Sequence, residues 1–250
     1  MIDLLLVGIG SGNPDHLTLQ AIKALNSADL ILIPEKGEGK EDLADMRRVI
    51  CSDLLDKPGP RLVSFDLPAR NPATPGYKAR VSDWHDAIAE VWKDTILAEN
   101  AQDARVALLV WGDPSLYDST LRIAERLGRA MPVRVTVIPG LTSLQVLTAV
   151  HAIPLNQVGA PVTITTGRRL RDEGWPEDAT TVAVMLDGEA SFQSLDPAGL
   201  HIWWGAFVGM PDQTLIEGPL AEVATRIADT RARLREAHGW VMDIYLLRRA

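Results

Sequence analysis

The sequence predicts an α/β protein built from two α/β domains. Short apolar runs alternate with helical patterns through the first half of the chain, which is typical of βα units that feed a mostly parallel sheet. The second half carries several strand patterns with few helical patterns between them, which indicates a mixed sheet. The 250 residues suffice for two domains, each with its own core. We therefore expect an N-terminal domain at 1–128, a C-terminal domain at 129–250, and an active site in the cleft between them.

The elements of the first half follow from the spacing of its apolar residues. Leu19, Ile22 and Leu25 recur at helical intervals. Trp84 and Trp92 share one face of a longer helical pattern, where we expect them to pack in a core. These patterns predict strands at 2–7, 29–33, 61–65 and 105–110, and helices at 18–26, 41–55 and 77–97.

The second half begins with one more strand-and-helix pair and then changes character. We expect a strand at 133–138 and a helix at 142–150. Apolar runs separated mainly by turn residues follow, and they favour a partly antiparallel arrangement. They predict strands at 162–165, 181–186, 201–208, 213–216 and 241–246.

Charge and cysteine content narrow the class of protein. A formal net charge of -8 argues against nonspecific binding to nucleic acid or to an anionic membrane. The single cysteine, Cys51, permits no internal disulfide, and the apolar windows are too short for a membrane span. The start of the chain has no pattern of a secretory signal. We therefore expect a soluble cytoplasmic protein that binds neither nucleic acid nor membrane.

Three glycines follow the first apolar run, in Gly8-Ile9-Gly10-Ser11-Gly12-Asn13-Pro14. Such a turn lets backbone approach a ligand closely, or simply turns the chain. A dinucleotide fingerprint needs a third glycine where Asn13 stands. Glu35, at the end of the second expected strand, still resembles the acid that binds a ribose hydroxyl. A nicotinamide-dependent oxidoreductase therefore remains an alternative.

Three further loops carry glycine, proline and small polar residues at strand ends. Each of them alone is compatible with an ordinary capped turn. Together with the glycine turn, they indicate a site that binds one polar, largely uncharged ligand through backbone groups and hydroxyls. The loops are 111–118, with Asp113 between Gly112 and Pro114, 138–143, with Thr142 and Ser143, and 208–213. The five histidines show no ligand spacing with each other or with Cys51, so we expect no metal site.

Taken in order, the glycine turn, Gly112-Asp113-Pro114, Ile138-Pro139-Gly140-Leu141-Thr142-Ser143 and the segment 213–218 resemble the tetrapyrrole methylase family along nearly the whole chain. The resemblance implies a homodimer that binds S-adenosyl-L-methionine between two α/β domains. It also implies methylation of a macrocycle on the route to cobalamin and sirohaem, with S-adenosylhomocysteine as a product.

Other segments resemble the branch of this family that methylates C1 of precorrin-5 and releases the acetyl group of the ring as acetate. Another precorrin C-methyltransferase remains the nearest alternative, and a non-catalytic tetrapyrrole carrier is a more distant one. The segments are Pro34-Glu35-Lys36-Gly37 with Asp42-Leu43, Tyr77 with 81–85, 111–120 and 239–248.

The cofactor contacts implied by the resemblance fall on loops of both domains. Ser11 replaces the proline of the family's usual G-x-G-P-G turn, and Leu186 aligns with a methionine that usually precedes a glycine. The positions carried over are Gly10, Ser11, Gly12, Trp111, Gly112, Asp113, Leu116, Thr142, Ser143, Met185, Leu186 and Val208.

The catalytic residues stay unassigned. Release of acetate needs a general base, and four side chains are candidates without a ranking: Asp15, His16, His85 and Tyr117. A polycarboxylate substrate also needs cationic partners, for which arginine is well suited. Two basic groups are candidates, although each is equally compatible with a solvated surface: Lys36, Lys40, Arg47 and Arg48, and Arg168, Arg169 and Arg171.

Overall fold

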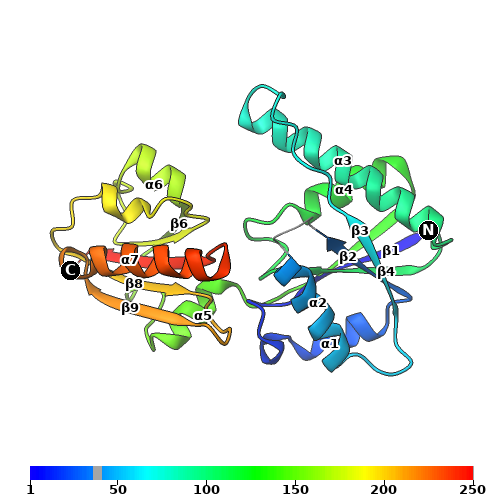
Figure 1. Ribbon diagram of the computed structural model, residues 1–250, viewed down its shortest axis with the longest axis horizontal. Helices are drawn as coiled ribbons and strands as arrows, with labels where there is room; N and C mark the ends of the chain where they lie inside the picture. Colours follow the sequence, from blue (N-terminus) through cyan, green and yellow to red (C-terminus); the bar gives the residue numbers. More distant parts are fainter. Residues whose placement is uncertain (36–40, 250) are drawn as a thin grey trace. The chain divides into compact units, whose positions relative to one another are not determined.

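The computed structural model describes residues 1–35 and 41–249, and the chain divides into two compact units (Figure 1). The first unit is Met1–Thr142 and the second is Ser143–Ala250. We expected the division at 128/129. The strand at 133–138, which that expectation assigned to the second domain, instead pairs in parallel with the first strand of the chain, so it completes the first sheet.

The first unit contains a five-stranded sheet in the order β3-β2-β4-β1-β5, and every pairing in it is parallel. The prediction of a parallel N-terminal sheet is therefore confirmed. Its strands are β1 (Ile2–Gly8), β2 (Leu30–Glu35), β3 (Arg61–Asp66), β4 (Arg105–Val110) and β5 (Val133–Ile138). Its helices are η1 (Pro14–His16), α1 (Leu19–Asn26), α2 (Glu41–Leu54), α3 (Tyr77–Ala98) and α4 (Thr120–Ala130).

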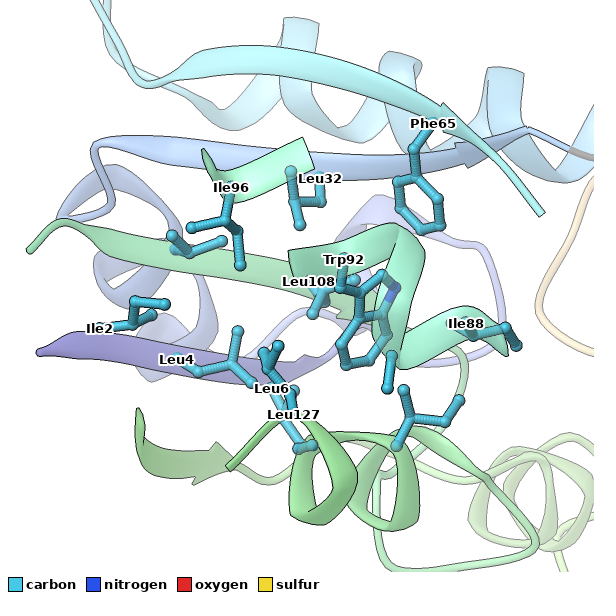
Figure 2. Close-up of a cluster of buried hydrophobic side chains, with 14 of the residues drawn as sticks. Ile2, Leu4, Leu6, Leu32, Phe65, Ile88, Trp92, Ile96, Leu108 and Leu127 are labelled. Atoms are coloured by element: carbon cyan, nitrogen blue, oxygen red, sulfur yellow. The ribbon is translucent and has the colours of Figure 1, made fainter. Parts of the chain in front are cut away.

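Helices cover both faces of this sheet, which explains why its central strands are apolar almost throughout. Successive side chains of β1 point to opposite faces. Leu4 and Leu6 join a cluster with Trp92 of α3 and Leu127 of α4, shown in Figure 2. Leu5 and Val7 join the cluster that includes Leu25 of α1 and Cys51 of α2. The sheet is thus held rigidly between two apolar layers, and the loops at its carboxyl edge have a fixed support.

Cys51 of α2 is only 3% exposed. Burial raises the pKa of its thiol to about 11. The group is therefore a neutral, apolar core residue at physiological pH.

The second unit contains a mixed sheet in the order β6-β7-β10-β8-β9. The β6–β7 pair is parallel, and the other pairs are antiparallel, which confirms the expected mixed character. Its strands are β6 (Val162–Thr166), β7 (Thr181–Met185), β8 (Leu200–Ala206), β9 (Thr214–Pro219) and β10 (Asp243–Arg249). Its helices are α5 (Ser143–Val150), α6 (Gly167–Glu173), η2 (Ser191–Ser194) and α7 (Leu220–His238).

The expectation of few helices in this unit was wrong for α7, which is 19 residues long. Its buried face includes Leu220, Val223 and Ile227, but it continues through Thr230 and Arg231. These two polar residues interrupt the apolar periodicity by which an amphipathic helix is recognised. Throughout 1–35 and 41–249, no helix combines the length and the apolar character that crossing a membrane requires.

Candidate functional site

Three loops at the carboxyl edge of the first sheet are tied together by backbone hydrogen bonds. The Gly112 amide, after β4, donates to the Gly10 carbonyl, after β1, at 2.8 Å, and the two residues form an isolated β-bridge. The Ile9 amide donates to the Val110 carbonyl at 2.9 Å. The glycine turn and the Gly112-Asp113-Pro114 loop therefore form one continuous surface, at the edge where parallel α/β sheets bind ligands.

Asp113 adds the loop after β5 to this surface. Its Oδ2 accepts a hydrogen bond from the Gly140 amide at 2.9 Å, and its Oδ1 accepts one from the Ser115 amide at 2.8 Å. Burial acts to raise the pKa of this carboxyl group, but the hydrogen bonds from Ser115 and Gly140 outweigh it and leave the pKa below its ordinary value. Asp113 is therefore ionised at neutral pH and holds two loops in register.

Close backbone packing requires glycine at the junction of these loops. A Cβ atom at Gly140 would lie 2.2 Å from the Gly112 carbonyl oxygen, and one at Gly8 would lie 2.6 Å from the Gly140 nitrogen. Gly10 and Gly12 have φ values of 73° and 104°, which other residues rarely adopt. Gly8 thus permits the close contact with the loop after β5, whereas Gly10 and Gly12 permit the turn itself.

Trp111 lies against the glycine turn. A Cβ atom at Gly12 would lie 3.0 Å from Trp111 Cζ3 and 3.2 Å from Trp111 Cη2. These carbons belong to the benzene ring of the indole, so the indole N–H lies at the end of the side chain away from Gly12. Glycine at position 12 therefore leaves room for the tryptophan ring.

The turn continues into a short 3-10 helix. The Asn13 side chain caps η1 by accepting from the Asp15 amide at 2.9 Å, and the Ser11 hydroxyl lies 3.1 Å from His16 Nδ1. A dinucleotide fingerprint instead places the third glycine at the start of an α-helix. Glu35 forms an ion pair with Arg48 of α2. Neither feature matches a ribose-binding loop.

The remaining predicted contacts of the first unit lie beside this surface. The Leu116 amide donates to the Asp113 carbonyl at 3.2 Å, which places Leu116 in the turn after Asp113. Thr142 is 7% exposed, and its Cα would lie 3.7 Å from a Cβ atom at Gly112. The structure thus brings together all predicted positions of the first unit: Gly10, Ser11, Gly12, Trp111, Gly112, Asp113, Leu116 and Thr142.

The other predicted positions lie in the second unit. Ser143 is the first residue of α5, and Met185 is the last residue of β7. Val208 follows β8, is 5% exposed and belongs to an apolar cluster against which Met185 packs. Leu186 has a left-handed φ of 53° and is 65% exposed. An exposed leucine held in this conformation is typical of a residue that contacts a ligand rather than a core.

A buried polar network next to Leu186 was missed in the sequence. Asp187 Oδ2 accepts from the Ser191 amide at 2.6 Å and from the Tyr245 hydroxyl at 2.7 Å. The Asp187 carbonyl accepts from Arg231 at 2.6 Å, and Arg231 also donates to Asp243 at 3.0 Å. The network anchors the residue that directly follows Leu186, so it fixes the loop. In the sequence, the one sign of this network was an aspartate, Asp187, directly after the predicted cofactor contact Leu186.

The candidate bases occupy different environments. Asp15 and Tyr117 are exposed, and Tyr117 has a left-handed φ of 50°. His16 contacts Ser11, within the glycine turn. His85 is 3% exposed inside α3, and burial lowers its pKa, as do the charges of nearby arginines. His16 thus lies in direct contact with Ser11, a predicted cofactor residue.

The two basic groups also differ. Arg169 and Arg171 form ion pairs with Glu173 and Glu189, which favours a surface role on α6. Arg48 pairs with Glu35, whereas Arg47 points inward and its Nε donates to the Leu109 carbonyl at 3.1 Å. Lys36 and Lys40 lie outside the described residues. Within the described ranges 1–35 and 41–249, no group of three or more side chains that could hold a metal ion is present.

Comparison with known proteins gives the same family as the motifs. The model of the Tetrapyrrole (Corrin/Porphyrin) Methylases matches residues 3–224. A protein of Sinorhizobium sp named precorrin-6A synthase [deacetylating] is 49% identical over 251 residues, which cover 100% of this chain and 96% of the relative.

Solved structures agree with this assignment. The putative cobalamin synthesis related protein (CobF) from Corynebacterium diphtheriae has a TM-score of 0.85 and 39% identity, covering 100% of this chain and 99% of that one. Uroporphyrin-III C-methyl transferase from Thermus thermophilus, complexed with S-adenyl homocysteine, shares the fold with a TM-score of 0.58 and 21% identity over 98% of this chain and 91% of that one. The chain therefore belongs to the tetrapyrrole (corrin/porphyrin) methylase family.

Proposed function

We propose that this chain is an S-adenosyl-L-methionine-dependent C-methyltransferase that methylates C1 of precorrin-5 and releases acetate, giving precorrin-6A. The observation that carries the proposal is the 49% identity, over the whole chain, to a relative named for this reaction. The three tied loops of the first unit support it, because they bring backbone groups and the Asp113 carboxylate together on one surface at the carboxyl edge of the sheet.

The residues present fit a methyl donor of this kind. Gly10 and Gly12 give the glycine turn its left-handed backbone conformation, and the turn lies at the edge of the sheet where α/β proteins bind ligands. Asp113 provides a fixed negative charge that favours a cationic sulfonium nearby. We infer that the cofactor is held by Gly10, Ser11, Gly12, Trp111, Gly112, Asp113, Leu116 and Thr142 of the first unit, with Ser143, Met185, Leu186 and Val208 of the second.

When bound, this cofactor supplies an activated methyl group, so the protein need not provide a metal or a nucleophile. The task of the chain is to align the two reactants and to exclude water. The rigid sheet beneath the loops suits alignment, since β1 pairs directly with both β4 and β5. Alignment of this kind contributes several kcal/mol to lowering a barrier, up to about 7–11 kcal/mol in favourable cases.

Release of acetate requires a second set of groups. Water adds to the acetyl carbonyl with loss of a proton to a base, and cleavage of the bond to C1 leaves the electron pair on C1. That carbon then accepts the methyl group. His16 is placed to serve as the base or to orient another group, because it lies beside Ser11 in the glycine turn.

Two measurements test the proposal against its alternatives. We expect isothermal titration to show micromolar binding of S-adenosylhomocysteine and no binding of NAD or NADP. A nicotinamide-dependent oxidoreductase would give the opposite result, and a tetrapyrrole carrier would bind the macrocycle alone. With precorrin-5 and S-adenosyl-L-methionine, we expect one methyl group gained and one equivalent of acetate released. Methylation without acetate would indicate another precorrin C-methyltransferase.

We also infer a homodimer in the cytoplasm. The family resemblance supports the dimer, and the single buried cysteine is compatible with a reducing compartment. Light scattering of the purified chain tests the first inference, because a mass near 27.3 kDa would indicate a monomer and twice that mass a dimer.

A further inference from the structure

A cavity of about 200 Å³ lies in the first unit at the carboxyl ends of β2, β3 and β4. Helices α2, α3 and α4 contribute to its wall. We call it the tryptophan cavity, defined by Arg47, Phe65, Trp84, Ile88, Trp92 and Trp111. Sites that enclose a whole drug-sized ligand measure about 300–1,000 Å³, while one water molecule takes about 30 Å³. The tryptophan cavity therefore suits a group of a few heavy atoms rather than a macrocycle.

Two of its tryptophans have indole N–H groups that lack a protein acceptor. Trp92 Nε1 and Trp111 Nε1 are buried, and neither has a hydrogen-bond partner in the part of the chain that the structure describes. Trp92 is 3% exposed, and Figure 2 shows its ring, with the nitrogen in blue, among Phe65, Ile88 and Leu108. Trp84, in the same wall, differs, because its N–H donates to the Pro68 carbonyl at 2.7 Å. Buried donors without an acceptor are rare, and two in one cavity indicate an acceptor supplied by a ligand.

The cavity wall also contains a cation, Arg47, together with the polar side chains of Asp118, Ser119 and Thr120. The Arg47 guanidinium carbon lies 5.4 Å from the centre of the Trp111 ring. Burial lowers the pKa of Arg47 to about 10, although the nearby Asp118 carboxylate acts to raise it, so the side chain stays charged at neutral pH. Asp118 itself accepts from the Thr120 amide at 2.6 Å, at the start of α4.

The chemistry of these groups specifies the ligand. Indole N–H and guanidinium groups are donors only, so the occupant must be a hydrogen-bond acceptor. The charge of Arg47 favours an anion, and the flat guanidinium suits a carboxylate. The apolar side chains of Phe65 and Ile88 in the same wall favour a short hydrocarbon stem on that carboxylate.

We propose that the tryptophan cavity is a receptor for a short aliphatic carboxylate, with Trp92, Trp111 and Arg47 as its donors. Which molecule supplies this carboxylate depends on the proposed function. A carboxylate arm of the macrocycle and the released acetate have the same chemistry, and the experiment must separate them. The Trp111 ring lies where a side chain at position 12 would stand, so an occupied cavity would lie close to the glycine turn.

The test observes the indole ¹⁵N–¹H resonances, of which the chain has seven. Acetate is titrated into the full chain, with acetamide as the neutral counterpart, and Trp92→Phe and Trp111→Phe assign the two resonances. We expect acetate to move these two resonances saturably and acetamide to move them at least tenfold less. Arg47→Met, which keeps an unbranched stem, should weaken acetate binding at least tenfold. Stationary resonances, or equal shifts of all seven, would overturn the proposal.

Trp175→Phe is the matched control. Trp175 lies in the second unit, and its N–H donates to the Ala179 carbonyl at 2.9 Å. We expect Trp175→Phe to lower the melting temperature more than Trp92→Phe does, and to leave acetate binding unchanged. If Trp92 had only a structural role, Trp92→Phe would lower the melting temperature more than Trp175→Phe does, and it would leave acetate binding unchanged.

Competition identifies the source of the carboxylate. Uroporphyrin III, which carries acetate and propionate arms, is titrated with and without saturating acetate. Weaker porphyrin binding in acetate assigns the cavity to an arm of the macrocycle, and unchanged binding assigns it to free acetate. Because no step of this test needs the methyl donor, a failure of S-adenosylhomocysteine binding would count against the proposed function and not against the receptor.

Discussion

The amide of Gly140 donates a 2.9 Å hydrogen bond to Oδ2 of Asp113, although the two residues lie 27 positions apart in the chain. This contact joins the loop after β5 to the loop after β4. The second oxygen of Asp113 is engaged by Ser115. A single carboxylate thus determines the relative position of two loops that we assign to the methyl donor.

Asp113→Asn is expected to weaken binding of S-adenosylhomocysteine about 10- to 100-fold. Asparagine replaces one acceptor oxygen with an NH2 group that only donates, so the bond from Gly140 or from Ser115 is lost, and a hydrogen bond to a charged group contributes about 1.5–3 kcal/mol. Isothermal titration measures the change. Asp196→Asn is the control, because Asp196 accepts from the Ala198 amide at 3.0 Å in a comparable exposed turn of the second unit.

The same variant should show a defined dependence of stability on pH. The folded pKa of Asp113 lies below its ordinary value of 3.8, so the carboxylate contributes stability above that pH and loses it as the pH falls through the folded value. The difference in melting temperature between the natural chain and Asp113→Asn should be constant at pH 5–8 and shrink below about pH 4. A difference that persists at pH 2 would contradict the ionic role.

Gly140→Ala should destabilise the first unit by about 1–3 kcal/mol. The new Cβ atom would meet the Gly112 carbonyl oxygen at 2.2 Å, and backbone cannot move aside as a flexible side chain can. Gly128→Ala provides the contrast, because Gly128 lies in α4 with no atom within 4 Å of an added Cβ. That change should stabilise the helix by about 0.5–1 kcal/mol. Thermal unfolding of the two variants should therefore shift in opposite directions.

Leu186→Gly is expected to separate stability from cofactor binding. Glycine relieves the left-handed φ of 53°, which offsets the entropy that glycine loses on folding, so the melting temperature should change little. Loss of the exposed side chain should weaken S-adenosylhomocysteine binding about tenfold, or about 1.4 kcal/mol. Val158→Gly, at a fully exposed position, should leave binding unchanged. Normal affinity in Leu186→Gly would remove Leu186 from the site.

Cys51 should resist thiol reagents in the folded chain at pH 8. Its burial and its pKa of about 11 leave almost no thiolate, which is the reactive form. We expect negligible labelling in buffer and one equivalent after unfolding in denaturant, followed by mass spectrometry. Rapid labelling without denaturant would show that α2 opens readily.

Some of these features could be read from the sequence, and others could not. The glycine turn and the Asp113 loop were predicted because backbone conformation leaves a residue-type signature at glycine, proline and aspartate. The division between the units was misplaced because the pairing of β5 with β1 is non-local and has no local signature. Trp84 and Trp92 share one helical face and have identical side chains, yet only Trp84 has an acceptor for its N–H among the described residues. Such a difference depends on tertiary placement and cannot be predicted from spacing.

The position of β5 in the first sheet has a consequence for biosynthesis. β1 leaves the ribosome early, but one of its two neighbours spans Val133–Ile138. At about 5–20 residues per second, the nascent chain needs on the order of 10 s to reach β5, and until β4 is made both edges of this apolar strand are unpaired. Gly140 emerges directly after that neighbour. Closure of the sheet and assembly of the first unit's loops that we assign to the methyl donor are therefore completed by the same short stretch of translation.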